Sequence, residues 1–120
     1  MRLGMIGSVL AALGVAAAAF GAHGLRGRLD EAALSTFETA ARYHLIHSIA
    51  IVLAGERAAR SPSRAAEIAG NIFLTGIVLF SGSLYALALG APHVVGLMTP
   101  FGGLALIAGW VALAVSFRAG

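Results

Sequence analysis

The sequence predicts an all-α integral membrane protein, a four-helix bundle with both termini on the cytoplasmic side. Hydrophobic residues make up 59% of its 120 residues and charged residues only 11%, whereas a soluble domain averages about 25% charged residues. The apolar residues form long uncharged runs that arginines flank. The length suits a single transmembrane domain, 1–120. The absence of cysteine excludes disulfides, thiolate nucleophiles and zinc–thiolate sites.

The first predicted span, 3–22, carries no charged residue. It has the length of about 20 residues that a helix needs to cross roughly 30 Å of hydrocarbon. A secretory signal peptide is the alternative, because Arg2, an apolar run and small residues follow one another in the order typical of such peptides. The run is long for the apolar part of a signal peptide, which favours a span.

The second predicted span, 37–56, needs support from residues upstream. Its strictly apolar part, 43–55, is too short to cross a membrane. Asp30 is a suitable N-cap, and apolar side chains recur at helical spacing after it, so we expect one helix from Asp30 to about Ala59. Its first part, 30–42, is predicted to lie at the interface, either along the membrane or in line with the span.

Two further spans are predicted, 68–90 and 100–117, and a polar cytoplasmic loop, 57–66, precedes the first of them. A hydroxyl residue followed by proline is expected to start each helix, because proline is favoured at the first helical position. The two predicted helix starts are Ser61-Pro62 and Thr99-Pro100.

Arginines are distributed unequally between the two ends of the four predicted spans. Five lie on the side of the termini and three on the other side, namely Arg2, Arg57, Arg60, Arg64 and Arg118 against Arg26, Arg28 and Arg42. The positive-inside rule therefore places both termini in the cytoplasm. In this orientation all four histidines are expected at the extracytoplasmic face: His23, His44, His47 and His93.

Small residues form stripes along three of the predicted spans. Lipid tails are as apolar as leucine, so helices associate in a membrane through close packing and polar contacts. The glycines in these stripes are predicted helix-packing positions: Gly7, Gly14, Gly21, Gly82, Gly90, Gly102 and Gly109. Chance in a chain rich in alanine and glycine is the alternative for one stripe, but three stripes together favour a compact bundle.

Histidines and tyrosines at a similar predicted depth form a candidate ligand or polar cluster: His23, Tyr43, His44, His47 and Tyr85. Imidazole binds zinc, copper and iron, paired histidines on two helices can hold haem, and a quinone head group is a further alternative. We favour the interpretation that the histidines hydrogen-bond backbone carbonyls near the interface. No metal site and no cofactor is therefore predicted.

Glu38 and Arg42 are a candidate ion pair, because they are four residues apart with the acid first, the favoured order in a helix. A proton relay is the alternative, since ionisable groups at membrane depth are functional candidates. No catalytic motif accompanies them, because the glycines lie inside spans and no span carries paired carboxylates. The chain is predicted not to be an enzyme, and no catalytic residue is assigned.

Four stretches in this order carry a family resemblance: "AFGAHGL" (19–25), "FETAARYHLIHSIA" (37–50), "GIVLFSGSLYALAL" (76–89) and "TPFGGLALIAGW" (99–110). The chain resembles the domain of unknown function 423 family, small bacterial membrane proteins similar to eukaryotic transmembrane protein 256. The resemblance covers nearly the whole chain. It implies a four-helix inner-membrane protein of unassigned activity, and it offers no catalytic residues to transfer.

Three functional hypotheses follow for a multi-pass protein of the bacterial inner membrane. The first is a non-enzymatic structural or accessory subunit of a membrane assembly, whose partners are the lipid bilayer and a second copy or another membrane protein. The second is a haem-, metal- or quinone-binding protein that uses the histidine cluster, and the third is a small oligomeric transporter or channel. Nucleic acid is not expected as a partner despite the pI of 10.7, because the arginines flank apolar runs.

Overall fold

The computed structural model describes residues 2–118, and every named element in that range is helical. The elements are α1 (Arg2–His23), α2 (Glu31–Arg60), α3 (Arg64–Gly76), η1 (Ile77–Ser81), α4 (Gly82–Ala88), η2 (His93–Leu97) and α5 (Met98–Arg118). The π-helical turn η1 joins α3 and α4 into one long helix, and η2 is a 3₁₀ turn before α5. The prediction of an all-α protein with four long helices is confirmed.

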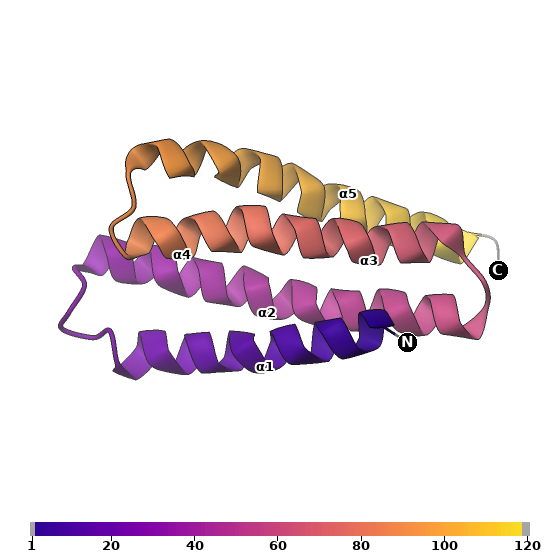
Figure 1. Cartoon of the computed structure of the whole chain (residues 1–120), viewed down its shortest axis with the longest axis horizontal. Coiled ribbons are helices and arrows are strands. Elements are labelled where there is room, and N and C mark those ends of the chain that lie inside the picture. Colours follow the sequence, from indigo (N-terminus) through magenta and orange to yellow (C-terminus); the bar gives the residue numbers. More distant parts are fainter. Residues whose placement is uncertain (1, 119–120) are drawn as a thin grey trace.

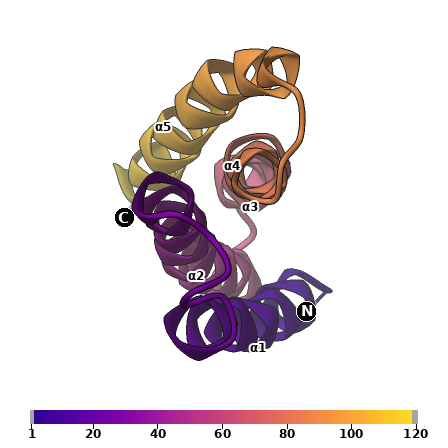
Figure 2. The ribbon, with the colours of Figure 1, turned by 90° about the vertical axis from the view of Figure 1, so that its left-hand side faces the viewer.

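The four long helices run antiparallel in chain order, from α1 at one edge to α5 at the other (Figure 1). α1 packs on α2, α2 packs on the α3–α4 helix, and that helix packs on α5; within the described residues α1 does not contact α5. Figure 2, a view from one end of the bundle, shows the same order of helices. The start of α1, the α2–α3 connection and the end of α5 lie toward one end, here called the terminal end. The α1–α2 and α4–η2 connections lie at the other, here called the loop end.

The main core lies where α2, α3 and α5 meet. Ile51 of α2 and Phe73 of α3 are fully buried there, together with Leu106 of α5. Leu3 and Leu10 attach α1 to this core from one side. The outer faces of α1 and α5 expose large apolar side chains along most of their length. Extended apolar faces of this kind suit contact with lipid or with another protein.

Helix α2 begins with Asp30 as its N-cap, as the sequence predicts. The Asp30 carboxylate accepts a hydrogen bond from the Ala33 backbone N–H at 2.8 Å, which satisfies one of the donors that a helix start leaves unpaired. From there α2 continues without a break to Arg60. The stretch 30–42 is therefore in line with the rest of α2.

Both predicted hydroxyl-and-proline helix starts are wrong. Ser61 is the C-cap of α2, and the hydroxyl of Ser63 accepts from the Ala66 N–H at 3.2 Å to start α3. α5 begins at Met98, directly after η2, so Pro100 lies within its first turn. The N–H groups of a first turn have no intrahelical partner, so proline is tolerated at more than one position there. Its place does not mark the first residue of the helix.

Three glycines of α1 face α2, where a larger side chain has little room. A Cβ added at Gly7 would lie 2.8 Å from the Ser48 carbonyl oxygen, and one at Gly21 would lie 2.9 Å from the Phe37 ring. Gly14 lies between these two contacts and also faces α2. The contacts bring the backbones of α1 and α2 close together. They place the middle of α2 beside the middle of α1.

Two glycines of α5 face the long α3–α4 helix. A Cβ at Gly102 would lie 2.7 Å from the carbonyl carbon of Leu79 in the π turn, and one at Gly109 would lie 2.6 Å from the Phe73 ring. The backbone of α5 therefore rests directly on the backbone of η1. This close approach depends on the missing side chain at Gly102.

The predicted packing roles of Gly82 and Gly90 are wrong. A Cβ at either position would meet no heavy atom within 4 Å. Gly90 has a φ of +106°, a left-handed conformation that favours glycine at the end of a helix. The long helix instead uses Gly70 and Gly76, which pack against the side chains of Leu3 and Leu106.

Three helical segments are long and apolar enough to cross a membrane: Arg2–His23, Arg64–Ala88 and His93–Arg118. α2 is not among them, although the sequence predicts a fourth span at 37–56. Its composition explains the difference, because α2 carries charges near both ends and buries two histidines and a serine between them. α2 also contacts every other long helix.

Candidate functional site

The polar side chains that could bind a ligand gather on α2. Among them, His44 connects α2 to two other helices. Its Nε2 atom lies 2.8 Å from the backbone carbonyl oxygen of Leu10 in α1, and its Nδ1 atom lies 2.8 Å from the hydroxyl of Tyr85 in α4. A carbonyl oxygen only accepts, so Nε2 carries the proton and donates. In the neutral ring Nδ1 then accepts from the Tyr85 O–H. His44 thus ties α1 and α4 to α2.

His47 lies one turn further along α2 and has the opposite tautomer. Its Nδ1 atom donates to the backbone carbonyl of Tyr43 at 2.7 Å, and its Nε2 atom accepts from the indole N–H of Trp110 in α5 at 3.0 Å. Indole only donates, so a protonated His47 would set two N–H groups against each other. The geometry therefore fits the neutral ring.

Aromatic rings surround His47. Trp110 meets His47 and Phe73 edge-on, with ring centroids 5.8 Å and 5.0 Å apart. The Tyr43 ring stacks on His47 at 5.9 Å and lies 4.9 Å from Phe80. Aromatic pairs of this kind contribute about 0.5–1.5 kcal/mol beyond their buried area. The rings therefore hold one another, and His47, in fixed positions.

The structure does not bring His23 together with His44 and His47, as the alternative of a shared metal or haem site would require. His44 contacts Leu10, and His23 lies thirteen residues further along α1, or about 20 Å at the helical rise. His23 and His93 are both exposed near the loop end. The expectation that all four histidines share one membrane face is wrong for His44 and His47. α2 starts well before its apolar part, so these two positions fall near its centre.

The two buried histidines use all of their ring nitrogens inside the chain. Two of the four bonds go to backbone carbonyls, one to a tyrosine and one to a tryptophan. A metal or haem iron bound at either ring would first have to displace one of these partners. Within residues 2–118 no group of three or more His, Cys, Asp or Glu side chains is arranged to hold a metal. The histidines act as links between helices.

Sequence reasoning missed Trp110 as a member of this cluster. It is the single tryptophan of the chain and lies inside an apolar helix. A buried indole N–H usually finds an acceptor, and such an acceptor is scarce among aliphatic neighbours. The need for an acceptor is a signal that could have paired Trp110 with a histidine.

Two serines, one in the π turn and one just after it in α4, have buried side chains. The Ser83 hydroxyl contacts the Phe80 carbonyl at 2.9 Å and the Thr99 hydroxyl, which links α4 to the first turn of α5. The Ser81 hydroxyl is buried and has no hydrogen-bond partner. Within the turn the Gly82 N–H bonds the Ile77 carbonyl, and single π turns of this kind are frequent at functional positions.

Arg57 links α2 to the end of α5. It donates to the backbone carbonyl of Ser116, and its guanidinium lies 5.3 Å from the centroid of the Phe117 ring. An arginine over an aromatic face gains electrostatic attraction from the ring. From the sequence, Arg57 was considered only as a charge that orients the protein in the membrane. This contact was therefore missed. Glu38 and Arg42 are exposed one turn apart on α2, and their ion pair stays a prediction.

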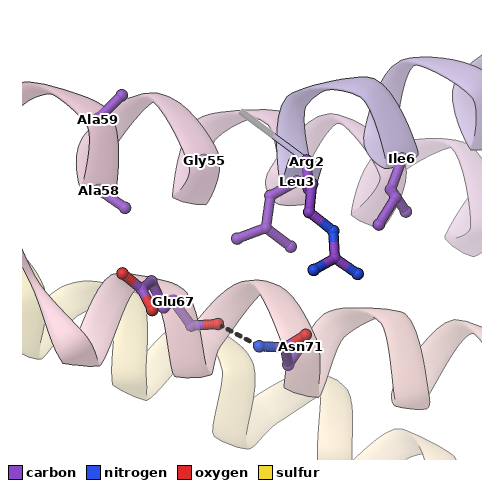
Figure 3. Close-up of a pocket in the computed structure, with 8 residues that line it drawn as sticks. All are labelled: Arg2, Leu3, Ile6, Gly55, Ala58, Ala59, Glu67 and Asn71. Carbon is purple, nitrogen blue, oxygen red and sulfur yellow. Dashed lines mark hydrogen bonds between the residues drawn. The ribbon is translucent and has the colours of Figure 1, made fainter.

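A pocket of about 450 Å³ opens near the terminal end, between α1, α2 and α3. Figure 3 shows Arg2 reaching from α1 toward Asn71 of α3. The Asn71 side-chain amide donates to the Glu67 backbone carbonyl at 3.0 Å, and the Glu67 carboxylate also borders the pocket. Small residues of α2 and the apolar side chains of Leu3 and Ile6 form the remaining wall. The pocket combines one cation with one anion, so its lining carries no net charge.

Antiparallel helices with apolar outer faces, joined by polar contacts between them, define a small helical membrane protein. The family model "Protein of unknown function (DUF423)" matches residues 17–103. The chain belongs to this family, which confirms the resemblance that its four motifs carry. No solved structure matches it with statistical significance.

Related proteins in several bacteria cover most of the chain. A UPF0382 membrane protein of Staphylococcus haemolyticus is 38% identical over 112 residues, which covers 93% of this chain and 91% of that protein. A UPF0382 membrane protein of Haemophilus influenzae is 43% identical over 100 residues, with coverage of 83% and 80%. The UPF0382 membrane protein YwdK of Bacillus subtilis is 36% identical over 113 residues, with coverage of 93% and 92%. Their names state a membrane location and no activity.

Proposed function

We propose that the protein is a non-enzymatic structural or accessory subunit of a membrane assembly in the bacterial inner membrane. The hydrogen bonds of its buried polar groups support this proposal. The buried histidines bond to groups of the same chain at every ring nitrogen, while the outer faces of α1 and α5 are apolar. The buried histidines thus hold helices together, and the outer faces offer surfaces for lipid or for another membrane protein.

The proposal includes α2 as a fourth span. The glycine contacts place the middle of α2 level with α1, which is long and apolar enough to cross. A polar helix is tolerated at membrane depth where its polar groups are buried in protein and bonded. His44 and His47 meet this condition, because α1, α4 and α5 supply three of their four partners and α2 supplies the fourth.

Four spans would place the start of α1 and the end of α5 on the same side, and we propose that this side is the cytoplasm. The basic residues support this orientation. The α2–α3 connection and its flanks carry Arg57, Arg60 and Arg64, whereas the α4–η2 connection carries no arginine. Excess arginine is typical of cytoplasmic loops.

Native mass spectrometry of the protein, extracted from its own membranes in a mild detergent, tests the assembly role. We expect a mass that includes a second protein chain, either another copy or a different membrane protein. A bare monomer that retains lipid but no protein, even at the lowest detergent concentration that extracts it, would contradict the proposal.

Two substitutions on opposite edges sharpen this test. Leu13 of α1 and Leu104 of α5 are 54% and 64% exposed, so Leu13→Trp and Leu104→Trp each alter an outer face without entering the core. We expect one of the two variants to lose the second chain while its helix content stays unchanged. Retention by both variants of every associated chain would contradict a role for these faces.

A further inference from the structure

The long α3–α4 helix has an outer face that carries polar residues, unlike the apolar outer faces of α1 and α5. Figure 2 shows α2 and α5 on one side of this helix and no helix on the opposite side. Exposed residues recur along the helix at spacings of three and four, which places them in one line. This line, here called the α3–α4 outer face, consists of Arg64, Glu67, Asn71, Thr75, Val78 and Gly82.

Two hydrogen-bonding side chains of the α3–α4 outer face lie at membrane depth. The segment Arg64–Ala88 is long and apolar enough to cross a membrane, and Gly76 lies halfway between its ends. At a rise of about 1.5 Å per residue, Thr75 is about 1.5 Å and Asn71 about 7.5 Å from this midpoint. Half of the hydrocarbon layer is about 15 Å thick. Both exposed side chains are therefore inside the hydrocarbon.

The bonds that these side chains make within the chain leave some of their hydrogen-bonding capacity unused. The Asn71 amide donates to the Glu67 backbone carbonyl at 3.0 Å, and the Thr75 hydroxyl donates to the Asn71 backbone carbonyl at 3.1 Å. Arg2 reaches toward Asn71 from α1 (Figure 3), but within residues 2–118 the side-chain oxygen of Asn71 accepts no hydrogen bond. Lipid tails offer no donor, so an asparagine at this depth favours a neighbouring protein helix.

We propose that the α3–α4 outer face pairs with the same face of a second copy of this chain. All copies insert in one orientation, so a two-fold axis along the membrane normal brings equal depths of two copies side by side. The face is complementary to itself in this arrangement. A carboxamide both donates and accepts, so the two Asn71 side chains can bond each other. Arg64 of each copy lies one turn from Glu67 of the other, which pairs opposite charges.

The surface around Asn71 allows a second helix to approach closely. A Cβ added at Gly82 would meet no heavy atom within 4 Å, and small residues at such open positions let two helix backbones come together in a membrane. Open pockets of about 450 Å³ toward α1 and about 300 Å³ toward α5 both border Asn71. These pockets can receive apolar side chains that flank the same face of the second copy.

This pairing goes beyond the accessory-subunit proposal, because it uses a different face of the protein. It leaves the outer faces of α1 and α5 free for lipid or for a further chain. It can be measured on the purified protein in liposomes, where no other protein is present. Absence of pairing there would leave the accessory role standing, and absence of a different partner protein would leave the pairing standing.

Introduced cysteines locate the contact between the two copies, because the chain has no cysteine of its own. The positions are Val78 on the α3–α4 outer face, Leu13 on α1 and Leu104 on α5, whose side chains are 61%, 54% and 64% exposed. Each lies near the middle of a segment long enough to cross the membrane. Each single-cysteine variant is purified, placed in phosphatidylcholine liposomes and oxidised.

We expect the Val78→Cys variant to form disulfide-linked dimers and the Leu13→Cys and Leu104→Cys variants to stay monomeric. A disulfide needs Cβ atoms about 3.5–4.5 Å apart, so only positions at the contact between copies react efficiently. Absence of a Val78→Cys dimer would assign the α3–α4 outer face to lipid or to a different protein and would overturn the proposal. Equal cross-linking at all three positions would indicate random collisions and would also overturn it.

A polar-to-apolar substitution tests the role of Asn71 in the Val78→Cys background. Asn71→Leu should raise the protein-to-lipid ratio needed for half-maximal cross-linking about tenfold, because a hydrogen bond between model membrane helices contributes about 1–2 kcal/mol. Ser8→Leu is the matched control, since it replaces an exposed polar residue of α1, and it should leave this ratio unchanged. Equal ratios for the two variants would contradict pairing through Asn71.

A charge reversal tests the pairing of Arg64 with Glu67 between copies. Glu67→Arg should weaken cross-linking by up to about fivefold, the factor that corresponds to the upper end of exposed ion-pair energies, because arginines of the two copies would then face each other. The double variant Arg64→Glu/Glu67→Arg exchanges the two charges and should restore cross-linking. A double variant that pairs no better than the single one would contradict the alignment of the two copies.

Discussion

Trp110 of α5 donates its indole N–H to Nε2 of His47 on α2 across 3.0 Å, although 63 residues separate them in the chain. The bond joins two helices that otherwise contact each other little. Because Nδ1 of His47 already donates to a backbone carbonyl, the neutral ring has one acceptor atom, and Trp110 uses it. The two side chains hold α2 and α5 at a fixed separation.

Trp110→Phe should weaken the fold by removing this donor while keeping an aromatic ring in place. In a double-mutant cycle with His47→Phe we expect a coupling free energy of about 0.6 kcal/mol, and no more than about 1.7 kcal/mol, as for other hydrogen bonds between membrane helices. Reversible unfolding in mixed micelles measures the four stabilities. A coupling near zero would show that the bond does not contribute.

His44→Phe should cost more than Tyr85→Phe. The first substitution removes two hydrogen bonds and leaves the Tyr85 hydroxyl without its acceptor, whereas the second removes one bond and leaves the bond to Leu10 intact. We expect a loss of unfolding free energy of about 2–3 kcal/mol for His44→Phe and about 1 kcal/mol for Tyr85→Phe. The same micelle unfolding measures both, and equal losses would contradict the bridging role of His44.

Adjacent glycines on α5 provide a matched pair of substitutions. Gly102→Ala should destabilise the protein by about 1–3 kcal/mol, because the new methyl group would overlap the backbone of the π turn and overpack the contact. Gly103→Ala meets only ordinary contacts, and its better helix propensity should leave stability unchanged or raise it by up to about 1 kcal/mol. Thermal unfolding followed by circular dichroism compares the two, and the reverse order would contradict the packing of α5 on η1.

Two serines near the π turn should respond in opposite ways. Ser81→Ala removes a buried hydroxyl without a partner and should be neutral or stabilising. Ser83→Ala breaks the link to Thr99 and should cost about 1 kcal/mol. If Ser81→Ala were the more destabilising of the two in the thermal unfolding assay, the Ser81 hydroxyl would have a partner in the membrane-embedded protein.

The sequence was sufficient to predict the helices, because the physics that sets them is local or periodic. Long apolar runs, the Asp30 cap and the stripes of small residues follow from spacing along one helix. The glycines of α1 show the limit of such reasoning, because their pattern resembles that of Gly82 and Gly90, which face open space. Which stripe is covered depends on how the helices are arranged, and spacing does not contain that information.

The candidate site was harder to predict, because its contacts join distant parts of the chain. His44 and His47 were found by residue type, but their depth was misplaced because α2 extends beyond its apolar part. The Leu10 carbonyl was missed because a backbone carbonyl carries no residue-specific signal, and Trp110 was missed although its indole N–H needs an acceptor. The π turn was also missed, because no residue pattern distinguishes it from the α-helix on either side.

Site-directed labelling of introduced cysteines tests the four-span arrangement most directly, and the chain has no cysteine of its own. Ala32→Cys, Pro62→Cys and His93→Cys place one thiol each at an exposed position near the three connections between the long helices. None of these changes alters the arginine balance. A membrane-impermeant maleimide is added to intact spheroplasts and, separately, to opened membranes.

Four spans with cytoplasmic termini predict that the Ala32→Cys and His93→Cys variants react in intact spheroplasts, while the Pro62→Cys variant reacts only after the membranes are opened. The opposite labelling of all three variants would keep four spans and reverse the orientation. If the Ala32→Cys and Pro62→Cys variants reacted from the same side, α2 would not cross the membrane, and the four-span arrangement would be contradicted.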